Sequence, residues 1–159
     1  MRHPRPRGLR PGRSLGALIL VALLAAAGCG EAPNELQPGE LLRDSLGLTS
    51  LDRVHVVRIT HREGREVATP DSLLVRPGDW VDFVGGDGWI RVVAFPFDSL
   101  DLAPRDFMEG NGVDASPPLL GADVHWAVPF TAAPPGRYPF SVMGSGAPGR
   151  GVVVVESRR

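Results

Sequence analysis

The cysteine and histidine side chains are the residues of this chain best suited to metal binding or covalent chemistry. The 159-residue sequence holds one cysteine and four histidines: Cys29, His3, His55, His61 and His125. His55 and His61 are six residues apart in a segment typical of a β-strand, which would separate them by about 20 Å and keep them from sharing a metal ion. His125 and its neighbour Trp126 point to opposite faces of the expected strand, and we expect His125 on the polar face. We therefore expect surface histidines and no metal site built from them.

Nucleophilic, phosphate-binding and calcium-binding patterns are missing from the sequence. Ser141 and Ser145 follow His125, but neither serine sits in the Gly-x-Ser-x-Gly turn of a nucleophile elbow. The glycine-rich residues 85–88 join two expected strands, whereas phosphate-binding loops lead into a helix. The acidic residues lack the regular spacing of a calcium loop. We expect no enzymatic activity.

The start of the chain has the pattern of a secretion signal. Five arginines and no acid occur in the first 13 residues, an apolar run spans residues 15–24, and small residues follow it. The run is shorter than the roughly 20 residues that a membrane-spanning helix needs. Residues 1–28 are therefore expected to be a signal peptide, which is removed together with His3.

Cys29 stands directly after this signal. The sequence Ala26-Ala27-Gly28-Cys29 resembles a bacterial lipobox, which implies that Cys29 is lipidated and becomes the first residue of the mature protein. The lipid would anchor the protein to a membrane of the cell envelope, facing the periplasm or the exterior. The alternative is ordinary cleavage after Ala27, which would give a secreted or soluble periplasmic protein.

Removal of the signal would leave an acidic chain. Residues 1–28 contain five of the 17 basic residues and none of the 18 acidic ones, so the remainder has a formal charge of −6. Nucleic acid is therefore not expected as a partner. Residues 29–50 predict a lipidated N-terminus and a polar, Pro- and Gly-containing tether, with a short helix over residues 40–48.

Residues 51–159 carry short β-type runs separated by Gly, Pro and Asp, which predicts one all-β domain built as an antiparallel sandwich or barrel. The four valines near the end of the chain are typical of a strand that is covered on both sides, more than of a sheet edge. Residues 104–109 have the spacing of a short helix. The expected strands span residues 54–60, 72–76, 80–84, 89–95, 124–128, 138–142 and 151–155.

Three segments of this domain, in order, resemble the cupredoxin family. Residues 73–84, Leu-Leu-Val-Arg-Pro-Gly-Asp-Trp-Val-Asp-Phe-Val, resemble the strand pair that leads to the first copper histidine. Residues 135–140, Pro-Gly-Arg-Tyr-Pro-Phe, resemble the entry to the ligand loop, and residues 151–155 resemble the closing strand. The resemblance covers roughly residues 51–156. It implies an eight-stranded Greek-key β-sandwich and, in typical members, a copper ion held by two histidines, a cysteine and a methionine.

The positions at which this resemblance places copper ligands hold other residues. Ile90, with Trp89 and Arg91 beside it, stands at the position of the first histidine, and Val142 stands at that of the cysteine. Ser145 and Arg150 stand at the positions of the second histidine and the methionine. We therefore expect no cofactor, and we interpret the protein as a cupredoxin-like binding or structural module. The alternative is a copper-binding electron-transfer protein with an unconventional site that uses Met143 and a histidine.

The long segment over residues 95–122 offers a surface for a partner. Loops of this length are usually functional or disordered. Its apolar side chains either cover one sheet as a small additional core or form an exposed aromatic patch that docks an envelope protein. The candidate partner-binding residues are Trp89, Phe97, Phe107 and Met108.

Overall fold

The computed structural model describes residues 38–157 of the chain. The predicted signal peptide, the lipidation site Cys29 and the tether up to residue 37 lie outside the described residues. The predicted short helix is present as α1, Pro38–Leu46. Within residues 38–157, no helix combines the length and the apolar character needed to cross a membrane.

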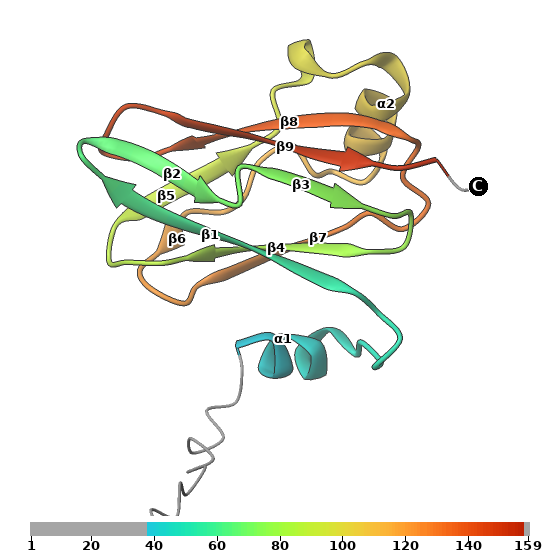
Figure 1. The fold of residues 1–159 in the computed structure, drawn as a ribbon, viewed down its shortest axis with the longest axis horizontal. Helices are drawn as coiled ribbons and strands as arrows, with labels where there is room; N and C mark the ends of the chain where they lie inside the picture. Colours follow the sequence, from blue (N-terminus) through green and yellow to red (C-terminus); the bar gives the residue numbers. More distant parts are fainter. Residues whose placement is uncertain (1–37, 158–159) are drawn as a thin grey trace, which may run out of the picture. The chain divides into compact units, whose positions relative to one another are not determined.

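The strands form a sandwich of two β-sheets (Figure 1). The first sheet has the order β2-β1-β4-β7, in which β1 is Val54–Arg62, β2 is Arg65–Thr69, β4 is Trp80–Gly85 and β7 is His125–Pro129. β1 pairs antiparallel with β2 and in parallel with β4, and β4 pairs antiparallel with β7.

The second sheet has the order β3-β9-β8-β5-β6. Its strands are β3 at Ser72–Val75, β5 at Ile90–Ala94, β6 at Leu119–Leu120, β8 at Gly136–Met143 and β9 at Gly149–Val155. The valine-rich strand β9 pairs with β3 on one side and β8 on the other, so it lies inside the sheet, as its composition predicts.

The predicted all-β sandwich is confirmed, with nine strands among the described residues where eight were expected. β2 and the two-residue β6 were not among the strands predicted from the sequence. In β2 the charged Glu66 and the small Ala68 face inward and are buried, whereas Val67 is only partly buried. This order reverses the usual alternation of apolar and polar residues, so the strand gives no period-two hydrophobic signal.

The core lies between the sheets, where alternate side chains of each strand point inward. Phe83 of β4 is at its centre: its ring packs edge-to-face on Phe140 with centroids 5.0 Å apart. The rings of Trp126 and Phe95 lie 5.6 Å and 6.1 Å from Phe83. Aromatic side chains from both sheets therefore meet across the interface, which fixes the distance between the sheets.

The long segment over residues 95–122 is folded onto the sandwich. It contains a short 3₁₀ helix, η1, at Phe97–Ser99, the helix α2 at Leu102–Gly110, and β6. Ser116 ties it to β5, because its Oγ accepts a hydrogen bond from the Val93 N–H at 3.0 Å and its own N–H donates to the Val93 carbonyl at 2.7 Å. Met108 is fully buried in the core, and Phe97 and Phe107 pack against it. Three of the four candidate partner-binding side chains thus serve packing in the folded domain.

We expect Met108→Ala to lower the free energy of unfolding by about 2–5 kcal/mol, since it would leave a cavity in the core. Leu102→Ala, on the same helix but 76% exposed, should change it by no more than about 0.5 kcal/mol. Urea unfolding followed by circular dichroism measures both values. Equal effects of the two substitutions would show that α2 does not pack on the core as described.

Candidate functional site

The residues at the expected copper-ligand positions do not form a ligand set. Ile90 is 61% exposed and Val142 is fully buried, while Ser145 and Arg150 are exposed. Side chains alternate along β5, so Arg91 and not Ile90 points inward, on the same face as the buried Val93. Val93 pairs with Val142 across the sheet. The inward-facing group at this end of the sandwich is therefore a guanidinium.

Arg91 forms two ion pairs with carboxylates of other segments. Its Nε donates to Glu66 Oε2 at 2.5 Å, and its Nη1 lies 2.5 Å from Asp87 Oδ1. The side chains of Arg91 and Glu66 are both fully buried, and that of Asp87 is 29% exposed. The remaining nitrogen, Nη2, is buried with no hydrogen-bond partner among the described residues. We call Arg91, Glu66, Asp87 and His61 the charged network.

Glu66 connects the charged network to the loop between β8 and β9. Its Oε1 accepts a hydrogen bond from the Gly146 N–H at 3.1 Å and lies 3.0 Å from His61 Nδ1. Asp87 accepts hydrogen bonds from the N–H groups of His61, at 2.8 Å, and Trp89, at 3.1 Å. The network therefore joins the β1–β2 hairpin, the β4–β5 turn and the β8–β9 loop.

Two glycines allow the loop to approach Glu66 and His61 this closely. A Cβ on Gly144 would lie 2.5 Å from Glu66 Oε1, and a Cβ on Gly146 would lie 2.6 Å from both His61 Cε1 and the Gly64 carbonyl oxygen. Any larger residue would push the loop away from the hairpin. Trp89 covers the network from outside: its ring stacks on His61 with centroids 5.3 Å apart and stays 51% exposed.

The hydrogen bonds in the network decide the pKa values of its acids. Burial alone would raise the pKa of Glu66, but hydrogen bonds from Arg91, His61 and Gly146 outweigh it and hold that pKa below its usual value. Burial would also raise the pKa of Asp87, yet hydrogen bonds from Arg91, His61 and Trp89 lower that pKa to about 2. Both carboxylates are therefore ionised at neutral pH.

A copper ion does not fit this end of the sandwich. Arginine has five N–H donors and no acceptor, so Arg91, which points inward beside the first-histidine position, repels a cation and cannot ligate it. The carboxylate of Glu66 is already bound to the ring of His61, to Arg91 and to the Gly146 N–H. Within residues 38–157, no group of three or more His, Cys, Asp or Glu side chains is placed to hold a metal ion.

The other two described histidines are also paired with carboxylates, which corrects the expectation of surface histidines. His55 Nε2 lies 2.8 Å from Asp79 Oδ2, and His125 Nδ1 lies 2.7 Å from Asp82 Oδ2. The side chains of His55, His61 and His125 are only 29%, 21% and 20% exposed. Burial raises the pKa of Asp82 although the hydrogen bond to His125 opposes the shift. His55 and His61 contact different acids at opposite ends of β1.

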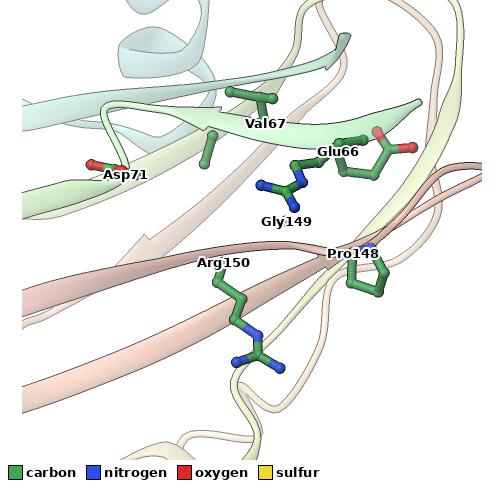
Figure 2. A pocket seen from close by; sticks show the side chains of 8 residues that line it. Glu66, Val67, Asp71, Pro148, Gly149 and Arg150 are labelled. Atoms are coloured by element: carbon green, nitrogen blue, oxygen red, sulfur yellow. The ribbon is translucent and has the colours of Figure 1, made fainter. Parts of the chain in front are cut away.

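A hollow of about 540 Å³ lies beside the charged network, between β2 and the first residues of β9 (Figure 2). Pro148, Gly149 and Arg150 form one wall, and Glu66, Val67 and Asp71 contribute to the other. Arg65 and Ala68 complete the lining. The acids of the lining are Glu66 and Asp71, and Glu66 is already bound to Arg91.

No protein-family model and no curated protein matches the chain. Solved structures with a similar fold include amicyanin from Paracoccus versutus, which is 20% identical, with 70% of this chain and 88% of that chain covered and a TM-score of 0.45. A fern plastocyanin mutant is 16% identical over 64% of this chain and 100% of its own, with a TM-score of 0.46. The copper-containing nitrite reductase from Thermus scotoductus is 19% identical over 70% of this chain and 24% of its own, with a TM-score of 0.49. These are cupredoxins, the family that the sequence resembles, and the likeness is one of fold.

The charged network was not predicted, although the sequence contains one signal for it. Arg91, Val93 and Phe95 alternate along one strand, and the last two are typical core residues. The alternation places Arg91 on the same inward face. An arginine at such a position needs an acidic partner, but nothing in the sequence identifies Glu66, 25 residues earlier, as that partner.

Acid should destabilise the domain between about pH 4 and pH 2. The pKa of Asp87 falls from 3.8 to about 2 on folding, so the folded state binds fewer protons and the stabilisation present above pH 4 is lost as the pH drops. Asp87→Asn should remove about 1–2 kcal/mol of this dependence, which urea unfolding at a series of pH values would measure. An unchanged pH profile in the variant would contradict the assignment.

Proposed function

We propose that this chain is an exported, lipid-anchored, cupredoxin-like binding or structural module that carries no metal. The observation that supports the metal-free part is the charged network, in which a buried guanidinium takes the inward position at the expected ligand end. Export and lipid attachment at Cys29 are supported by the sequence pattern of residues 1–29. A fold shared with redox proteins does not by itself assign their chemistry.

A patch of exposed apolar side chains beside the network supports the binding role. Ile90 and Leu120 face each other across β5 and β6, and Met143 of β8 pairs with Val92 of β5. Their exposed fractions are 61% for Ile90, 64% for Leu120 and 46% for Met143. Trp89 precedes Ile90 in the sequence and is 51% exposed, and we call these four side chains the apolar patch. Exposed apolar side chains on neighbouring strands often mark an interaction site, and we propose that an envelope protein binds here.

The alternative of a copper-binding electron carrier requires Met143 and a histidine in one place. Val142 of β8 is buried and Met143, the next residue, is 46% exposed, so its side chain points to the outer face of the second sheet. His61 points inward, where it contacts Glu66. The two groups therefore lie on different faces of the second sheet, which favours the metal-free proposal.

The protein purified from a bacterial envelope, titrated with Cu(II) and Cu(I), should bind no stoichiometric copper and show no blue absorption band. Arg91 repels the ion and no thiolate is present in residues 38–157 to ligate it. Mass spectrometry of the same preparation should show a lipid on Cys29. Tight binding of one copper ion per chain would contradict the metal-free role. An unmodified N-terminus beginning at Gly28 would contradict the lipid anchor.

Photo-cross-linking in living cells tests the apolar patch. A photoreactive residue in place of Leu120 should yield one predominant adduct with an envelope protein, whereas the same residue in place of Leu102, also exposed but on α2, should yield none. Trp89→Ala should reduce the adduct at least several-fold, since a tryptophan at the centre of an interface contributes about 2 kcal/mol or more. Adducts of equal yield from both positions, or a yield that Trp89→Ala leaves unchanged, would argue against docking at this patch.

A further inference from the structure

The charged network does more than exclude copper. It brings three acceptors around one cation: Oε2 of Glu66, Oδ1 of Asp87 and, at 3.3 Å from Nη1, the Trp89 carbonyl oxygen. These acceptors belong to the β1–β2 hairpin and the β4–β5 turn, and Glu66 extends the connection to the β8–β9 loop through Gly146. The arrangement is that of a cation-binding site in which the cation is a side chain of the protein itself.

We propose that the guanidinium of Arg91 is the resident cation of this end of the sandwich and holds the β8–β9 loop and the β4–β5 turn against the β1–β2 hairpin. This inference rests on the metal-free function proposed above. It assigns to Arg91 a positioning role that a bound ion fulfils in other proteins: without the guanidinium, the buried carboxylate of Glu66 would keep only His61 and the Gly146 N–H as partners.

The shape of the guanidinium is part of the proposal. Its Nε and Nη1 donate to two carboxylates on different segments at 2.5 Å each, which uses the planar fork of arginine. A lysine ammonium is a single point charge on a flexible chain and does not reproduce two donors at fixed spacing. The site should therefore distinguish a guanidinium from an ammonium ion of similar size.

Chemical rescue tests this directly. Arg91→Ala removes two carbons and a guanidinium, and ethylguanidinium supplies the same atoms. We expect Arg91→Ala to lower the melting temperature by roughly 10–20 °C, because it leaves a buried charge unpaired. Millimolar ethylguanidinium, far below the molar range in which guanidinium denatures proteins, should restore part of the loss in a saturable manner. Propylammonium at the same concentration should restore none.

Arg105→Ala is the matched control. Arg105 also pairs with a glutamate, since its Nε donates to Glu109 at 2.8 Å, but both side chains are more than 40% exposed. We expect a small change in melting temperature and no rescue by ethylguanidinium. Equal rescue of both variants, rescue by propylammonium as well, or a melting temperature of Arg91→Ala equal to that of the wild type would overturn the proposal.

A measurement on the wild-type protein covers the case in which Arg91→Ala does not fold. The Nε–H proton of Arg91 should give a resolved NMR signal that exchanges with water at least tenfold more slowly than that of Arg105, because it is buried and hydrogen-bonded. Exchange as fast as at Arg105 would overturn the proposal. Copper binding by the wild type would instead overturn the proposed metal-free function, so the two failures are distinguishable.

Discussion

The buried ion pair between Glu66 and Arg91 is the interaction on which one end of this domain depends. Removing two charges from water is costly, and their attraction offsets that cost only when the geometry is good and the remaining hydrogen-bonding groups are satisfied. Glu66 meets this condition, because its oxygens face Arg91, His61 and the Gly146 N–H. Each of these partners comes from a different strand or loop, so the ion pair can form only when the two sheets are correctly packed.

This dependence explains the local sequence around the pair. Gly144 and Gly146 leave no room for a Cβ beside Glu66 and His61, and a Cβ on Gly149 would contact the Glu66 carbonyl oxygen. The β8–β9 loop is thus shaped around a glutamate. A metal ion binds from solution, and its ligands must first lose protons. A guanidinium is covalently attached and always charged, so this end of the sandwich forms without any external ligand.

Much of the fold follows from the sequence, because strands with inward-facing Val, Phe and Tyr show a regular period of two. The strands around Phe83, Phe95 and Phe140 were predictable for this reason. β2 was not predictable, since Glu66 points inward from it, and a glutamate in a sequence normally indicates a side chain that faces the solvent. Two of the three histidines were misjudged for a related reason: their partner acids are distant in sequence, 24 residues from His55 and 43 from His125. Pairwise electrostatics between such segments leaves no local pattern.

The charged network also bears on how a partner would be recognised. The interior of this end is filled by Arg91 and Glu66, so the proposed partner would have to bind on the outside, where Trp89 is exposed. The Trp89 N–H donates to Asp87, and its ring stacks on His61, which itself contacts Glu66. The indole is therefore held by the same network that closes the site. Because a side chain already fixed in place loses little entropy on binding, the charges inside the sandwich would also lower the cost of burying this indole in the proposed interface.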